Sequence, residues 1–225
     1  MKKKAIIISI KSYKLTLKEK NLLSHEKPWG LILFKRNIKS LRQISNLIKE
    51  IRKLTKDTKF PIMIDEEGAM VSRLSKIINH KETQKLFGDL YKFKPKVSVK
   101  LYKEYITNLC NKLKSIGISI NTVPVLDVLR KNTNKIIGSR SYSMDPEIVK
   151  ILGKICVKQY EINKVATVIK HIPGHGCSNL DSHLKLSKVK MSYKELNKTD
   201  FAPFKNNISK FAMTAHILFK NIDQK

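Results

Sequence analysis

One stretch of this chain concentrates side chains that transfer protons or bind metals. Residues 170–183 read Lys-His-Ile-Pro-Gly-His-Gly-Cys-Ser-Asn-Leu-Asp-Ser-His, with polar groups at Lys170, His171, His175, Asp181 and His183. Proline and glycine disfavour a helix here, so we expect an ordered loop that leaves the apolar run before it. Loops of this kind are where a scaffold presents binding and catalytic groups. The stretch therefore indicates a functional site.

These side chains leave more than one chemistry open. Imidazole and carboxylate groups are ordinary zinc ligands, so His171, His175, Asp181 and His183 could form a metal site. The Pro and Gly residues between His171 and His175 prevent the helical turn that would place both on one face, which argues against that interpretation. A third interpretation is that the histidines only hydrogen-bond loops, and His175 is expected to brace the loop from inside. We expect no metal and no cofactor.

A second polar cluster follows an apolar segment. Residues 61–64 (Pro-Ile-Met-Ile) run directly into Asp65, Glu66 and Glu67. Carboxylates at a strand end either bind a ligand, because each offers two acceptor oxygens, or cap the following helix. Spacing alone leaves both roles open. Arg140 is one of only six arginines in a chain that otherwise uses lysine, which indicates that its planar fork is needed.

The elements that must hold these groups alternate between strand and helix. Short β-branched runs predict strands at residues 5–10, 29–34, 61–64, 118–123, 165–169 and 211–214. Segments of helical period lie between several of them, which is typical of βα units around a parallel sheet. No internal repeat or linker marks a boundary, so we expect a single domain over residues 1–225.

Capping patterns locate four helices. We predict one that is opened by Ser40, one that ends near Gly117, one that starts at Asp145 and one that starts at Ser192. The helix that starts at Asp145 is expected to face inward through Ile148, Ile151, Leu152 and Ile155.

Four motifs together resemble one enzyme family. They are the Lys-His-Ile-Pro-Gly-His-Gly and Asp-Ser-His runs within residues 170–183, Asp-Glu-Glu-Gly at 65–68, Asn-Thr-Val-Pro-Val-Leu-Asp at 121–127 and Ile-Gly-Ser-Arg-Ser-Tyr at 137–142. The set resembles the bacterial β-N-acetylhexosaminidases of glycoside hydrolase family 3. Ala69 and Met70 depart from the pattern, because the family usually has Gly and Arg there. Loss of that Arg would remove one structural or ligand contact.

The resemblance implies a role for each polar group. A saccharide that contains N-acetylglucosamine would be bound by Asp65, Arg73, Arg140, Lys170 and His171. Asp181 would orient His183 and keep it basic, so that His183 gives a proton to the leaving oxygen and later takes one from water. Residues expected close behind the site are Asp127, His175 and His216. The implied reaction is retaining hydrolysis of terminal β-linked N-acetylglucosamine from cell-wall (peptidoglycan) fragments.

The resemblance also implies parts that residues 1–225 do not include. The family's barrel has eight βα units, whereas the pattern predicts about six, so we expect an incomplete TIM-type (β/α)8 barrel. The family's nucleophile is an Asp after the seventh strand, and we expect no further strand after His216. The alternative function is therefore a catalytically dead sugar-binding or degenerate fragment. Two open sheet edges would favour self-association or pairing with a complementary fragment.

Composition narrows the expected partners and location. The formal net charge is +28, but the lysines are scattered, which favours weak salt-dependent contact with nucleic acid over a specific complex. The three cysteines lie far apart, and the apolar run near the N-terminus is too short for a signal peptide. No stretch is apolar enough to span a membrane. We therefore expect a cytoplasmic protein without a membrane partner.

Overall fold

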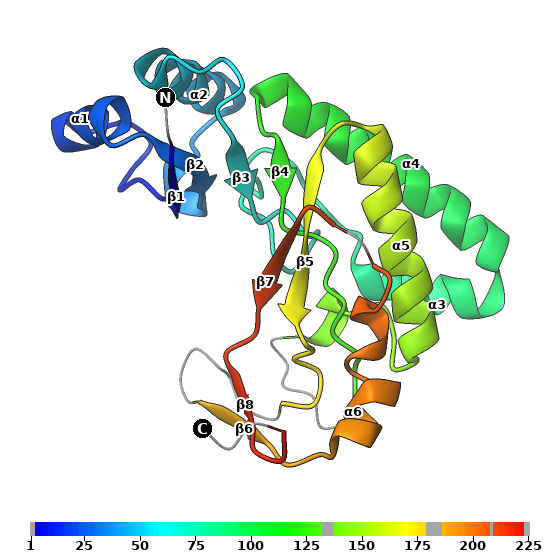
Figure 1. The fold of residues 1–225 in the computed structure, drawn as a ribbon. Coiled ribbons are helices and arrows are strands. Elements are labelled where there is room, and N and C mark those ends of the chain that lie inside the picture. Colours follow the sequence, from blue (N-terminus) through cyan, green and yellow to red (C-terminus); the bar gives the residue numbers. More distant parts are fainter. Residues whose placement is uncertain (1–2, 132–136, 179–185, 208, 223–225) are drawn as a thin grey trace.

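The described part of the chain is built around a parallel sheet. The computed structural model describes residues 3–131, 137–178, 186–207 and 209–222. Six parallel strands form the main sheet in the order β1 (Lys4–Ile8), β2 (Pro28–Leu33), β3 (Ile62–Ile64), β4 (Ile120–Asn121), β5 (Ala166–Ile172) and β7 (Phe211–Thr214). All six predicted strands are confirmed. Their curved arrangement confirms the predicted incomplete barrel (Figure 1).

Alternating strand residues build two apolar clusters, because successive side chains of a strand point to opposite faces of the sheet. In β2 and β3 the main core receives Leu31, Leu33, Ile62 and Ile64. The intervening Ile32 and Met63 belong to a smaller cluster with Ile120 and Val168. The main core also holds apolar residues of α2, α4 and α5, so it lies between the sheet and these helices.

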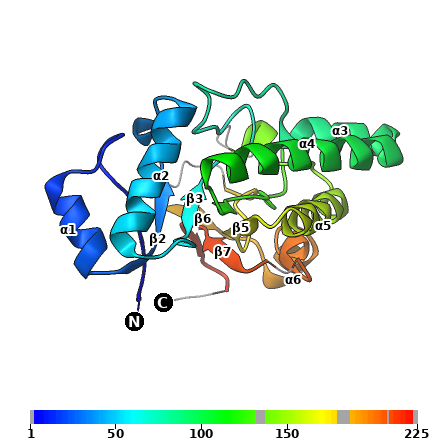
Figure 2. The ribbon, with the colours of Figure 1, turned by 90° about the horizontal axis from the view of Figure 1, so that it is seen from above.

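The described α-helices lie on the outer side of the curved sheet, except the last of them, which lies beyond the ends of β5 and β7 (Figure 1 and Figure 2). They are α1 (Leu17–His25), α2 (Leu41–Thr55), α3 (Gln84–Phe93), α4 (Pro95–Ile116), α5 (Pro146–Ile162) and α6 (Tyr193–Lys198). The four predicted helices are confirmed: Ser40, Asp145 and Ser192 are the N-caps of α2, α5 and α6, and Gly117 is the C-cap of α4. None of the helices in the described ranges combines the length and apolar composition needed to cross a membrane.

Two sequence predictions about these elements are wrong in detail. Ile151 of α5 is 37% exposed. The buried face of α5 runs instead through Val149, Leu152, Cys156 and Tyr160, which follow one another at helical spacing. In addition, β8 (Ile217–Phe219) follows His216, where no strand was expected, and pairs with β6 (Ser187–Val189) outside the main sheet. Three residues are too few to give an alternating pattern.

Candidate active site

The carboxyl ends of neighbouring strands meet in one cavity. Asp65 follows β3, Lys170 and His171 lie near the end of β5, and His216 follows β7. Side chains at these positions converge because parallel strands end at the same edge of the sheet. The cavity has a volume of about 390 Å³, within the range of small-molecule sites. It is lined by seven of the predicted site residues: Asp65, Arg73, Arg140, Lys170, His171, His175 and His216.

Asp65, which lines this cavity, is held by three neighbours. Its Oδ2 accepts a hydrogen bond from Arg73 Nη2 at 2.8 Å, and its Oδ1 accepts one from the Thr122 hydroxyl. Lys170 Nζ lies 3.7 Å from Oδ1. Burial alone would raise the pKa of Asp65, but the charge of Lys170 and the hydrogen bonds from Thr122 and Arg73 outweigh it and lower the pKa. Asp65 therefore stays ionised and able to accept hydrogen bonds.

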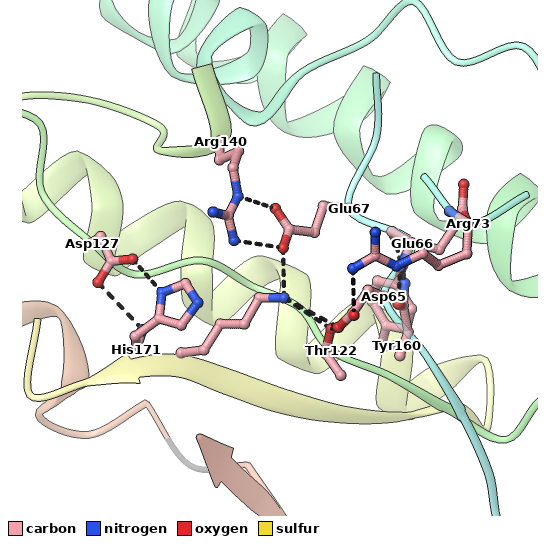
Figure 3. A network of polar contacts seen from close by, with 11 residues as sticks. Asp65, Glu66, Glu67, Arg73, Thr122, Asp127, Arg140, Tyr160 and His171 are labelled. Carbon is pink, nitrogen blue, oxygen red and sulfur yellow. Dashed lines mark hydrogen bonds and ion pairs between the residues drawn. The ribbon is translucent and has the colours of Figure 1, made fainter. Parts of the chain in front are cut away.

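Glu67 joins two of the predicted binding residues. Its carboxylate accepts hydrogen bonds from Arg140 Nε at 2.7 Å and Arg140 Nη2 at 2.9 Å, and Lys170 Nζ lies 2.5 Å from Oε1 (Figure 3). Lys170 also donates to the Thr122 hydroxyl at 2.9 Å. Burial acts to raise the pKa of Glu67, but the charges of Lys170 and Arg140 and their hydrogen bonds lower it. Glu67 is therefore an anion shared by two cations.

Asp127 holds the loop that contains His171 and His175. It is fully buried, and His171 Nδ1 lies 2.7 Å from its Oδ2 (Figure 3). The backbone N–H groups of His171 and His175 donate to Oδ1 at 3.3 and 2.7 Å. Burial acts to raise the pKa of Asp127, but the charge and hydrogen bonds of His171 and the His175 N–H lower it. Burial lowers the pKa of His175 and favours its neutral form.

Glu66 organises the segment that follows β3. Its side chain is fully buried and accepts hydrogen bonds from the Ser72 hydroxyl at 2.5 Å and from the backbone N–H groups of Arg73 and Leu74, both at 2.9 Å. His80 Nε2 lies 2.8 Å from Glu66 Oε1. Glu66 therefore draws residues 72–80 against the end of β3 and sets where Arg73 enters the cavity.

The alternative that the acids after β3 only cap a helix is wrong. The next α-helix, α3, has Thr83 as its N-cap, and Glu66 and Glu67 contact the cavity-side groups described above. The sequence patterns single out neither Glu66 nor Glu67 as an individual site residue, and they do not point to Thr122. The signal for Glu66 and Glu67 was present, since they continue the acid run that begins at Asp65. Thr122 carried no comparable signal.

The predicted acid/base pair, Asp181 and His183, lies outside the described residues. On either side of that segment, the hydroxyls of Ser178 and Ser187 are 2.6 Å apart, so the chain on both sides of it is held together. Two of the four residues considered as zinc ligands are thus not described. Among the residues that are, no group of three or more His, Cys, Asp or Glu side chains is arranged to hold a metal ion.

Known proteins are similar to this chain in both sequence and architecture. A family model described as the glycosyl hydrolase family 3 N-terminal domain matches residues 2–225. A β-hexosaminidase of Stenotrophomonas maltophilia (strain R551-3) is 28% identical over 220 residues, which cover 96% of this chain and 65% of that protein. A β-hexosaminidase of Neisseria gonorrhoeae (strain NCCP11945) is 30% identical over 224 residues, which cover 98% of this chain and 62% of that protein.

A solved structure supports the same assignment. NagZ from Neisseria gonorrhoeae, crystallised in complex with N-trifluoroacetyl-D-glucosamine, superposes with a TM-score of 0.92 at 28% identity. The match covers 99% of this chain and 66% of that one. The chain thus spans slightly less than two thirds of the length of these relatives. By the family match over residues 2–225, the chain belongs to glycosyl hydrolase family 3, in its N-terminal domain.

Proposed function

We propose that the cavity binds an N-acetylglucosamine unit and that the protein is a β-N-acetylhexosaminidase. Its substrate would be a cell-wall (peptidoglycan) fragment with a terminal β-linked N-acetylglucosamine, hydrolysed with retention of configuration. The observation that carries the proposal is the set of charged donors and acceptors that line the cavity at the carboxyl ends of the strands. The same proposal includes a role in peptidoglycan recycling and a location in the cytoplasm. It also treats residues 1–225 as a single domain.

The polarity of the cavity suits a sugar. Asp65 offers carboxylate oxygens to hydroxyl donors, while Arg140 and Lys170 offer N–H groups to hydroxyl or amide oxygens. Apolar side chains of Phe34 and Met213 line the same cavity and could cover the nonpolar face of a sugar ring. NagZ from Neisseria gonorrhoeae, whose crystal structure contains an N-acylated glucosamine, has the same architecture.

The proposed chemistry assigns proton transfer to Asp181 and His183. The adjacent carboxylate would stabilise the imidazolium form of His183, so that this side chain could protonate the leaving oxygen and later activate water. The bonded pair Ser178 and Ser187 would hold the two ends of the segment that carries these groups next to each other. Asp127, His175 and His216 would position the loop and the neighbouring strand end.

A sugar-binding protein without turnover is the second candidate. Retaining hydrolysis requires a nucleophile in addition to an acid/base group. The two carboxylates among the described residues that line the cavity, Asp65 and Glu67, are both tied to cations. An ionised carboxylate that is engaged in this way is better suited to binding than to forming a covalent intermediate.

A paired experiment distinguishes the two candidates. The 225-residue chain is titrated with N-acetylglucosamine by calorimetry and assayed for release of a chromophore from an aryl β-N-acetylglucosaminide. Binding together with turnover that is lost in His183→Ala supports the glycosidase. Retained turnover in the exposed-histidine control His25→Ala shows that the loss is specific.

The remaining outcomes are also decisive. Binding of N-acetylglucosamine without chromophore release supports the sugar-binding protein. Turnover that survives in His183→Ala removes His183 from the mechanism. If the wild-type chain neither binds the sugar nor releases the chromophore, both candidates fail.

We also infer that a polypeptide of these 225 residues associates with itself or with a complementary fragment. Within the described residues, β1 and β7 each have one partner in the main sheet, so each presents an unpaired strand edge. Strand edges of this kind are templates for pairing with another chain.

A further inference from the structure

We propose that Glu67 is a positioning residue that sets the two cationic binding groups, Lys170 and Arg140, in one fixed arrangement. The inference rests on the proposed function, because it concerns how the cavity would hold its sugar. Glu67 is not among the residues proposed above to contact the sugar. Its side chain is 3% exposed, so it acts on a ligand through the groups that it holds.

The geometry gives Glu67 control over both cations. Its two oxygens take the Nε and Nη2 donors of Arg140, a two-point contact that fixes the plane of the guanidinium as well as its position. One of the same oxygens lies 2.5 Å from Lys170 Nζ. Arg140 comes from the segment before α5 and Lys170 from β5, so a single carboxylate joins two separate elements.

The charges explain why a neutral acceptor could not replace Glu67. Lys170 has a side-chain exposure of only 3%, and Arg140 has one of 12%. Buried cations need nearby anions, because removal of one partner leaves an uncompensated charge in a poorly solvated site. Asp65 lies 3.7 Å from Lys170 and is already paired with Arg73. Glu67 is therefore the closest counterion of Lys170 and the direct partner of Arg140.

In this arrangement the carboxylates of Asp65 and Glu67 have different roles. Asp65 is 12% exposed and lines the cavity beside Arg73, so it can meet a ligand. Glu67 is more deeply buried, and both of its carboxylate oxygens contact Arg140 or Lys170. Arg140 and Lys170 both line the cavity, so they would face the ligand in the arrangement that Glu67 sets. Loss of the Glu67 charge should therefore weaken sugar binding without removing a contact to the sugar itself.

Glu67→Gln tests this role because it preserves shape and removes charge. We expect the dissociation constant for N-acetylglucosamine, measured by calorimetry, to rise about 10- to 100-fold, the scale of a lost charged hydrogen bond. Glu104→Gln on the exposed face of α4 is the matched control and should bind as the wild type does. Equal binding by Glu67→Gln and the wild type would overturn the proposal.

A double-mutant cycle separates positioning from general support of the fold. Because Glu67 acts partly through Lys170, adding Glu67→Gln to Lys170→Met should weaken sugar binding by a smaller factor than adding it to the wild type. Fully additive losses would overturn the proposal. The double variant also removes one charge of each sign, so it should fold even if Glu67→Gln alone is too unstable to purify.

A readout without sugar keeps this inference distinct from the proposed function. In the wild-type chain the Arg140 Nε–H group, bonded to Glu67, should give a slowly exchanging nuclear magnetic resonance signal that disappears in Glu67→Gln. If the wild type binds no sugar but shows this signal, the proposed function fails while the Glu67–Arg140 contact stands. If the signal is absent from the wild type, the positioning role is wrong.

Discussion

At the residue scale, the site depends on carboxylates that are held ionised by their neighbours. Asp65, Glu67 and Asp127 have lowered pKa values, because cationic or hydrogen-bonding partners outweigh burial. A lowered folded-state pKa contributes stability that is present above the unfolded pKa, near 4, and lost as pH falls through the folded value. These three carboxylates should therefore stabilise the fold at neutral pH, and their contribution should be lost only in acid, where they become protonated.

Asp127 is the most sharply testable of the three. Asp127→Asn replaces one acceptor oxygen with an NH2 group facing either His171 Nδ1 or two backbone N–H donors. We expect a loss of about 1–3 kcal/mol in the free energy of unfolding, measured with urea, and weaker binding of N-acetylglucosamine. Asp89→Asn, at a 43% exposed ion pair on α3, is the control. Equal stability of Asp127→Asn and Asp89→Asn would contradict the role of Asp127.

The sequence predicted these residues unevenly, for a physical reason. Asp65, Lys170 and His171 stand where strands end, and that position alone indicates the functional edge of a parallel sheet. The partners that hold them could not be read in the same way. Glu67 meets Arg140 across 73 residues, and Thr122 meets Asp65 across 57. Such pairings depend on how the strands curve, which no local pattern encodes.

At the element scale, apolar runs and capping residues predicted the strands and helices that hydrophobic burial stabilises most. The six strands of the main sheet and the helices α2, α4, α5 and α6 each carry such a pattern. By contrast, α1 buries one residue, Leu23, and begins at a Thr16–Glu19 capping box that is a weak signal by itself. Helix α3 does not show such a pattern, because two of its three buried residues are Gln84 and Gly88, and glycine usually argues against a helix.

Gly88 gives α3 a testable role in the site. A Cβ atom at this position would lie 1.8 Å from the Tyr142 carbonyl oxygen, in the segment that follows Arg140. Gly88→Ala should push α3 away from that segment, lower the free energy of unfolding by about 1–3 kcal/mol and weaken sugar binding. Urea denaturation and calorimetry measure the two effects. Lys92→Ala, exposed on the same helix, should change neither, and a stability of Gly88→Ala within about 0.5 kcal/mol of wild type would contradict the close approach.

At the scale of the whole molecule, two features act against each other. The formal net charge of +28 repels copies of the chain from one another and should attract polyanions without sequence preference. The strand edges at β1 and β7 favour association. Because exposed charges are screened by salt whereas strand pairing is not, the balance should depend on ionic strength.

Self-association of the 225-residue chain should therefore increase with salt. At about 0.1 M salt the Debye length is about 10 Å, and at about 1 M it is about 3 Å, so repulsion between copies fades over this range. Sedimentation velocity at several protein concentrations should show larger species as salt rises. Ile6→Lys places a charge on the β1 edge, where Ile6 is 52% exposed, and should reduce assembly. Leu17→Lys adds the same charge at an 85% exposed position of α1 and should have little effect. A single monomeric species at every salt and protein concentration would show that these edges do not pair, and equal effects of the two substitutions would assign the association to net charge alone.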